Sequence, residues 1–443
     1  MGNRFHSVTL DTDACKGCIN CIKRCPTEAI RVRDGKAHII TERCIDCGEC
    51  IRVCPNHAKK AVYDSLSIID DYEYTIALPA PSLYGQFNNL DDKEIVLDAL
   101  LKMGFDAVYE VAAAAEIVSD ATRKLMKQGA LKLPVISSAC PAVVRLIRVR
   151  FHELIPNILP LHAPIELAAR IAKKKAANLT GLPMEKIGAI FISPCPAKVS
   201  AIRYPLGAQK SYVDGAVAMS EVYPRLIHLM KELEDEDQSD KVVDAGRIGV
   251  GWASSGGEAA ALINENYLAA DGIENVIKVL EDLEDERFSG LEFVELNACS
   301  GGCVGGVLTV ENPYIAKAKL KRLRKYLPVS CNHLRDERMS KLEWDAPLDK
   351  SNALQLDQDM NKAMEKLNEM EEIVSRLHGL DCGSCGAPSC MALAEDVVRG
   401  FAQEEDCIFN MKEQMEEFLE QMADQKSYIE PPFTIKKGRE EKE

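Results

Sequence analysis

The sequence predicts a central α/β domain with largely parallel strands, a small α+β module before it and a helical extension after it. Two observations lead to this prediction. All but one of the 17 cysteines fall into four sets of four, and only Cys331 is left over. In the central region, short apolar segments end just before cysteines, and helical patterns separate these segments.

The first two sets of cysteines share the spacing C-x2-C-x2-C-x3-C-P, which is the bacterial run that binds two [4Fe-4S] clusters. They are Cys15, Cys18, Cys21, Cys25 and Cys44, Cys47, Cys50, Cys54. In such runs the fourth cysteine binds the other cluster, so we expect Cys54 to complete the first set and Cys25 the second. Alternating apolar residues around Asp34-Gly35 predict a hairpin between the runs. Two zinc sites are the alternative, but they require CxxC pairs.

Composition and charge narrow the class of protein. A chain of 443 residues with 47% apolar residues is long enough for two or three globular domains. The net charge of −15 argues against a nucleic-acid partner or an anionic membrane surface. The first residues contain no apolar leader, and no run of about twenty apolar residues occurs. We therefore expect a cytoplasmic protein without a membrane partner, in a reducing, low-oxygen compartment.

The third set comprises cysteines that are far apart in the sequence: Cys140, Cys195, Cys299 and Cys303. Predicted strands at 133–136, 187–192 and 291–296 end just before the first three. Helical patterns at 163–175, 221–232, 258–268 and 274–283 separate the strands. In α/β domains, ligands collect at the carboxyl ends of parallel strands, so four thiolates should meet at one cofactor. Any one of these cysteines alone would more often be a buried core thiol.

The fourth set lies near the C-terminus and consists of Cys382, Cys385, Cys390 and Cys407. We expect a helix from Met391 to Phe409 to carry the last cysteine back to the others. The segment resembles the small four-cysteine iron-sulfur domain of several redox proteins. A zinc site is the alternative.

Three central motifs carry a resemblance to a known family. Ser137-Ser138-Ala139-Cys140-Pro141, Pro194-Cys195-Pro196-Ala197-Lys198 and the segment from Glu295 to Cys303 match TSCCP, PCxxK and ExMACxxGCxxGG. Residues 1 to about 335 therefore resemble an [FeFe]-hydrogenase catalytic subunit with its ferredoxin domain. The resemblance implies a two-lobed central domain. It also implies reversible H2 cleavage, with protons and a redox partner such as ferredoxin as co-substrates.

The same resemblance implies a cofactor and its binding residues. An H-cluster would consist of a [4Fe-4S] cluster held by the third set and a diiron subcluster with CO and cyanide ligands, bridged by Cys303. Lys198 would hydrogen-bond one cyanide, and Pro81 and Ser82 would line the site. From sequence alone, a solvated surface lysine is the alternative for Lys198. With the other three sets, the protein would carry three accessory [4Fe-4S] clusters.

The departures from the family pattern fall on residues that move protons. Ala139 stands where the family has a proton-donating cysteine, and Ala201 where it has a glutamate. Two methionines near the diiron unit align with Ser193 and Asn297. This pattern resembles the sensory branch of the family, and loss of a general acid typically slows turnover by ~10²- to 10⁴-fold. An ordinary hydrogenase with another proton path, through water or Ser137, Ser138 and Glu295, is one alternative. A non-catalytic iron-sulfur protein without a diiron unit is the other.

The C-terminal extension carries two stripes with heptad spacing. The first comprises Ala353, Leu356, Met360, Ala363, Leu367, Met370, Val374 and Leu377; the second comprises Ile408, Met411, Met415, Phe418 and Met422. We expect them to pair within the chain; alternatively they form a homodimer or dock a signalling kinase or phosphatase.

The predicted domains are 1–62, the ferredoxin-like domain; 63–335, the H-cluster domain; 336–352, a linker with a hinge at 341–351; 353–430, the helical region with the four-cysteine motif; and 431–443, a charged tail.

Overall fold

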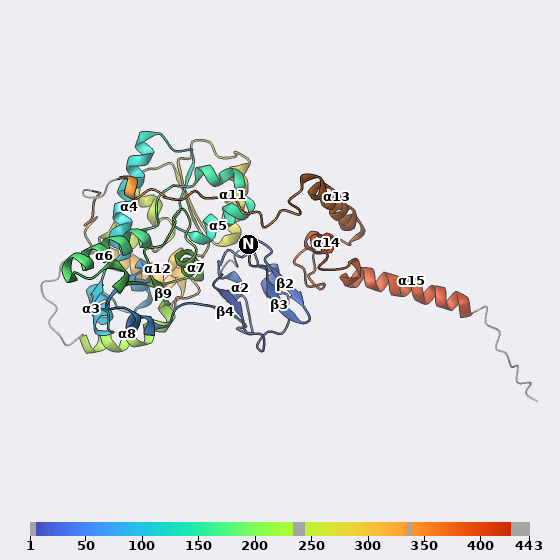
Figure 1. The fold of residues 1–443 in the computed structure, drawn as a ribbon, viewed down its shortest axis with the longest axis horizontal. Helices are drawn as coiled ribbons and strands as arrows, with labels where there is room; N and C mark the ends of the chain where they lie inside the picture. Colours follow the sequence, from blue (N-terminus) through green and yellow to red (C-terminus); the bar gives the residue numbers. More distant parts are fainter. Residues whose placement is uncertain (1–5, 234–243, 335–338, 427–443) are drawn as a thin grey trace, which may run out of the picture. The chain divides into compact units, whose positions relative to one another are not determined.

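The computed structural model describes residues 6–233, 244–334 and 339–426 (Figure 1). The chain forms two compact units that divide between Leu354 and Gln355. The charged tail expected at 431–443 lies outside the described residues.

The N-terminal module contains two short pairs of strands. β1 (Val8–Leu10) pairs with β4 (Lys59–Ala61), and β2 (Ile30–Arg33) pairs with β3 (Lys36–Ile39), all antiparallel. Asp34 and Gly35 form the turn between β2 and β3 with positive φ angles of 50° and 69°, as a two-residue hairpin requires. The expected hairpin is therefore confirmed. Short helices α1 (Asn20–Lys23) and α2 (Glu49–Arg52) lie within the two cysteine runs.

Two parallel sheets form the central domain. The larger has the order β6-β5-β8-β9, and the smaller has the order β10-β11-β7. Their strands are β5 (Tyr74–Pro79), β6 (Ala107–Val108), β7 (Val135–Ile136), β8 (Ile187–Ser193), β9 (Gly215–Ala218), β10 (Tyr267–Asp271) and β11 (Phe293–Asn297). β8 is fully buried along its length, as expected for a central strand of a parallel sheet.

The smaller sheet separates two apolar cores. Val135 and Phe293 belong to the core of the larger sheet, whereas their chain neighbours Ile136 and Val294 belong to a second core. Successive side chains of a strand point to opposite faces, so one face of this sheet contacts each core. The prediction of two lobes with parallel sheets is confirmed.

Helices connect and cover these strands. They are α3 (Glu94–Lys102), α4 (Val111–Gln128), α5 (Pro141–Arg150), α6 (Pro164–Thr180), α7 (Pro196–Arg203), α8 (Met219–Leu233), α9 (Arg247–Gly251), α10 (Gly257–Ala261), α11 (Ile273–Glu284) and α12 (Pro313–Arg324). Short 3-10 helices lie at Leu66–Asp71, Pro81–Gln86, His152–Asn157, Met184–Lys186, Cys303–Gly305 and Met339–Lys341. α6 packs on β5 and β8, and on α4.

The helix expected at 258–268 is wrong over more than half of its length. α10 ends at Ala261, Ile263 adopts a left-handed conformation with φ 54°, and Asn264 accepts a hydrogen bond from the N–H of Asn266. Residues from Tyr267 onward form β10 because they pair in parallel with β11. A non-local strand pairing has overridden the local helical pattern.

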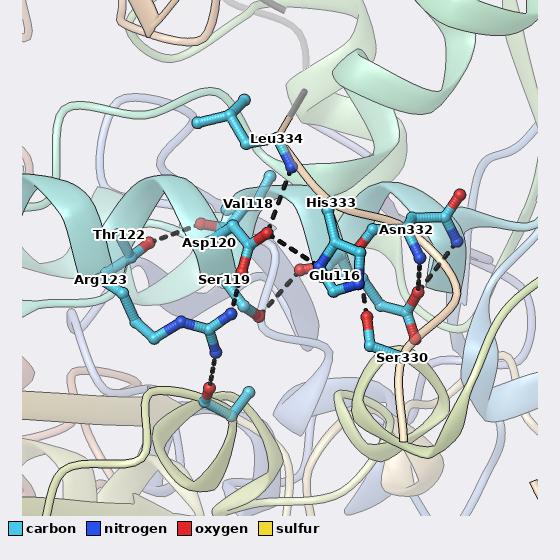
Figure 2. A network of polar contacts seen from close by, with 12 residues as sticks. Glu116, Val118, Ser119, Asp120, Thr122, Arg123, Ser330, Asn332, His333 and Leu334 are labelled. Carbon is cyan, nitrogen blue, oxygen red and sulfur yellow. Dashed lines mark hydrogen bonds and ion pairs between the residues drawn. The ribbon is translucent and has the colours of Figure 1, made fainter. Parts of the chain in front are cut away.

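Polar contacts fasten the segment 330–334 to α4 (Figure 2). The buried Glu116 accepts hydrogen bonds from the N–H groups of Gly246, Cys331 and Asn332 and from the Asn332 side chain. Asp120, one turn later, accepts one from the N–H of Leu334. The thiol-bearing residue Cys331 is exposed.

Residues just after 338 pack against the central domain. Leu342 is buried, and its carbonyl accepts a hydrogen bond from the N–H of His162. Trp344 donates its N–H to the carbonyl of Pro160 and packs on Gly207. These contacts hold Leu342 and Trp344, within the predicted linker, against the central domain.

The C-terminal unit contains α13 (Met360–Arg376), α14 (Cys390–Val398), a 3-10 turn at Glu404–Asp406 and α15 (Ile408–Lys426). Asp359 caps α13, so the first residues of the first stripe are not helical. The expected helix 391–409 is also wrong, because Gly400 adopts φ 77° and ends α14. The 3-10 turn then leads into Cys407.

The expected pairing of the two stripes is wrong as well. Ile373 and Leu377 of the α13 segment pack with Ala392 and Leu393 of α14. The second stripe is left exposed, with Met411, Met415, Phe418 and Met422 between 46% and 61% accessible. Among the described residues, every helix is too short or too polar to cross a membrane.

Candidate active site and metal centres

The N-terminal module brings its eight cysteines together in two groups. One small pocket is lined by Cys15, Cys18, Cys21 and Cys54, and another by Cys25, Cys44, Cys47 and Cys50. The fourth cysteine of each run lies with the first three cysteines of the other run, as in two-cluster ferredoxins. The N–H of Ala29 donates to the sulfur of Cys25 at 3.2 Å, and that of Ala58 to Cys54 at 3.3 Å. Such bonds stabilise thiolate ligands of a cluster.

The central cysteines lie where three strands end and helices begin. Cys140 and Cys195 are the N-cap residues of α5 and α7, each followed by proline at the first helical position. Cys299 follows β11, and Cys303 begins the 3-10 helix of the same loop. Burial, together with a smaller effect of neighbouring thiols of the set, raises the pKa of Cys195 to about 11 and that of Cys303 to about 12. Four thiols so close together in a buried site suit a [4Fe-4S] cluster.

Glycines allow the Cys299–Gly306 loop to pack closely. A Cβ on Gly302 would lie 2.4 Å from the nitrogen of Ser255, and one on Gly306 would lie 2.1 Å from the carbonyl oxygen of Pro194. Gly302 also has φ 92°, which side chains disfavour. The loop therefore approaches both neighbouring backbone segments more closely than any other residue would permit.

A cavity lies beside Cys303. Its walls include Lys198, whose ammonium is buried and donates to the carbonyl of Ala139 at 2.9 Å. Phe191, Trp252 and Ile165 supply apolar surface. A buried cation with a neutral acceptor suits an anionic ligand in this cavity, because burying an unpaired charge is costly. The donor set and the space fit a metal group that carries anionic ligands.

The structure separates the predicted cavity residues into two groups. Ala139, Asn297, Pro81 and Ser82 line the cavity with Cys303 and Lys198. Ser193 does not; its hydroxyl donates to the carbonyl of Cys195 at 2.9 Å. Ala201 lines a neighbouring pocket that also includes Lys198.

Two buried carboxyl groups complete the cavity wall. Ser137 donates to Glu258 at 2.6 Å, and Glu295 accepts hydrogen bonds from Asn297 and from the N–H groups of Gly256 and Ala259. Burial, with Glu295 nearby, raises the pKa of Glu258 to about 8, and burial also raises the pKa of Glu295. Two coupled carboxyl groups that hold a proton near neutral pH are suited to proton transfer. Glu295 could be predicted from the sequence as part of a proton path, whereas no role was predicted for Glu258.

The fourth set of cysteines also lines one pocket, in the C-terminal unit. Asp381 accepts a hydrogen bond from the N–H of Cys390, and burial by α13 and α14 shields Cys407. Glycines at 383 and 386 adopt positive φ angles, which lets the chain wrap around the pocket.

Metal content tests this fourth centre. With the diiron unit, four clusters give roughly eighteen irons per chain, and Cys385→Ser should remove about four of them because a cluster needs all its thiolates. Iron and zinc analysis of the anaerobically prepared full chain provides the measurement. Cys331→Ser, which removes an exposed thiol outside the four sets, is the control. Bound zinc with about four fewer irons in the parent chain would contradict the assignment.

The fold and cysteine groups define an iron-sulfur protein with a buried cavity at one cluster site. Comparison with family models agrees: residues 73–307 match the iron only hydrogenase large subunit, C-terminal domain. Residues 7–55 match a 4Fe-4S dicluster domain, and residues 377–409 match a short Fe-S cluster model. The chain belongs to the [FeFe]-hydrogenase family, with ferredoxin-type and C-terminal iron-sulfur domains.

Individual relatives are distant. The chain is 29% identical over 216 residues to the periplasmic [Fe] hydrogenase large subunit of Nitratidesulfovibrio vulgaris, covering 44% of this chain and 51% of that protein. It is 27% identical over 137 residues to the cytosolic Fe-S cluster assembly factor nar1 of Aspergillus flavus, covering 30% and 24%. The chain spans about half the length of the curated hydrogenases it matches. A solved apo [FeFe]-hydrogenase variant from Chlamydomonas reinhardtii aligns at 15% identity with a TM-score of 0.45, over 58% of this chain and 86% of that one.

Proposed function

We propose that this protein reacts reversibly with H2 at an H-cluster and does so slowly, in a sensory or regulatory role. The observation that carries the proposal is the cavity beside Cys303, in which Lys198 is present and a titratable side chain at position 139 is not. Cys140, Cys195, Cys299 and Cys303 would hold the [4Fe-4S] part, with Cys303 as the bridge. When bound, the diiron unit would supply the metal at which H2 is converted into two protons and two electrons.

The protein's own residues would orient the cofactor and handle protons. Lys198 would donate to an anionic ligand of the diiron unit, in addition to the carbonyl of Ala139. Phe191 and Trp252 keep the cavity apolar and exclude water. Protons would leave through Glu258 and Glu295, because Ala139 and Ala201 cannot titrate. A path of two coupled buried acids is compatible with low turnover.

Electrons would leave through the two clusters of the N-terminal module to a carrier such as ferredoxin. The fourth cluster belongs to the C-terminal unit, where the exposed stripe of α15 offers an apolar contact surface. We propose that this unit is the output side, which contacts a signalling kinase or phosphatase, or a second copy of the chain. A non-catalytic role remains the second candidate, since a cluster assembly factor is among the relatives.

Infrared spectroscopy tests the proposed function. The anaerobically matured full chain should show CO and cyanide stretching bands, because only the diiron unit carries these ligands. These bands should change when H2 replaces argon. A matured chain with all its iron-sulfur clusters but without such bands would contradict the proposal and favour the assembly-type role.

A further inference from the structure

The segment that carries Cys44, Cys47 and Cys50 contacts the two helices that begin at Cys140 and Cys195 and the chain just after Cys303. Three of its residues make the contacts: Asp46, Gly48 and Arg52. A Cβ on Gly48 would meet the Val307 side chain at 2.7 Å, so the two loops touch directly. The cluster held by Cys25, Cys44, Cys47 and Cys50 is thus the one next to the cavity.

Asp46 is the centre of a buried polar network. Its side chain is 1% exposed, and its Oδ2 accepts hydrogen bonds from Arg145 at 2.9 Å and from the Ser200 hydroxyl at 2.6 Å. Its Oδ1 accepts from the N–H groups of Ser7 and Val8 at 2.8 and 3.2 Å. A buried carboxylate with this many donors is fully satisfied, which such a charge requires.

Two of these donors lie on helices that begin at cysteines of the central set. Arg145 lies on α5, which begins at Cys140, and Ser200 lies on α7, which begins at Cys195. One carboxylate, placed between the ligands Cys44 and Cys47, therefore bonds to both helices that start at ligands of the central set. The two cluster sites are held in a fixed relation by this network.

Arg52 makes the third link. It follows Cys50 in α2, and its Nη2 donates to the carbonyl of Gly305 at 2.8 Å, two residues after Cys303. Its Nε pairs with the Glu49 carboxylate at 3.3 Å, while the Nη2 end of the guanidinium stays on the Gly305 carbonyl. A cation at this place favours negative charge on the central cluster, as reduction produces.

We propose that Asp46 and Arg52 are positioning residues of the electron relay, Asp46 by holding the two cluster sites together and Arg52 by raising the reduction potential of the central cluster. In each step one electron moves from the central cluster, which is oxidised, to the cluster of Cys25, Cys44, Cys47 and Cys50, which is reduced. A ferredoxin-type carrier then accepts it. The inference rests on the cluster assignments of the proposed function, but not on the diiron unit.

Redox titration of the full-length chain, followed by electron paramagnetic resonance, tests the role of Arg52. In Arg52→Gln the ratio of reduced to oxidised central cluster at a fixed potential should fall by about tenfold, which is about 59 mV for one electron. Arg52→Lys should largely restore it. Lys60→Gln is the matched control, since it removes an exposed cation of the same module that pairs with Asp11. An unchanged potential in Arg52→Gln, or an equal shift in Lys60→Gln, would overturn this role.

The spectrum of the fully reduced protein tests the role of Asp46. Magnetic coupling between the two clusters depends on their separation, so Asp46→Asn should weaken the coupling while iron content stays constant. Unchanged coupling would overturn the positioning role. Loss of about four irons would also overturn it, because Asp46 would then retain the cluster rather than place it. Both experiments can also be carried out on protein that shows no infrared CO bands. Failure of the proposed function, which those bands test, can therefore be distinguished from failure of this inference.

Discussion

Cys303→Ser should abolish reaction with H2. The thiolate of Cys303 is the only one of the central set that lines the cavity, so it is the ligand able to join a cluster to a group in that cavity. A serine hydroxyl is a hard oxygen ligand with a much higher pKa than a thiol, and it binds iron-sulfur clusters poorly. Dye reduction under H2 should fall to the background rate, and the CO and cyanide bands should be lost.

A matched variant shows whether the loss is specific to the bridge. Cys390→Ser removes a ligand of the fourth set, in the other compact unit, and should leave the infrared bands in place. If Cys303→Ser still reduces the dye with H2, the bridging assignment is wrong.

Glu258→Gln should lower H2 evolution by ~10²- to 10⁴-fold, the usual range for loss of a proton-transfer group. Glutamine keeps the acceptor for the Ser137 hydroxyl but cannot carry the proton. Since burial raises the pKa of Glu258 to about 8, the parent holds this proton at neutral pH and loses it above pH 8. H2 evolution by the parent should decline over that range, and the variant should lack this decline. Dye-linked rates at equal infrared band intensity give the measurement.

Two further variants separate proton delivery from a general effect of buried acids. Glu166→Gln is the control, because desolvation also raises the pKa of the half-buried Glu166, which lines the neighbouring pocket instead. It should keep most of the activity. Ala139→Cys, which places a thiol at the cavity wall, should raise the rate of the parent by up to ~10²-fold. If Glu166→Gln slows the protein as much as Glu258→Gln does, proton transfer through Glu258 is excluded as the cause.

The features that could be predicted from the sequence are those specified locally. Cysteine spacing encodes the ferredoxin runs, because each cluster takes three ligands from one short segment. The strand ends at Cys195 and Cys299 could be predicted because compact apolar segments precede them. The turn at Asp34-Gly35 is equally local, since two residues determine its conformation.

The features that were missed depend on contacts between distant segments. Glu258, Ser137 and Glu295 come from three separate parts of the chain, and only the fold makes Glu258 a buried neighbour of Glu295. The strand at 267–271 exists because of its partner β11, so its local pattern indicated a helix. The heptad spacing of α15 correctly indicated a helix but did not identify which surface would cover it.

The tight packing of Gly302 and Gly306 limits how this site can be redesigned. A library that varies these positions would return almost exclusively misfolded clones, since even alanine collides with backbone atoms of Ser255 or Pro194. Useful diversity is better placed at Ala139, a small residue that lines the cavity. The loop from Cys299 to Gly306 is thus a fixed part for protein engineers, and the surrounding cavity is the part that can be varied.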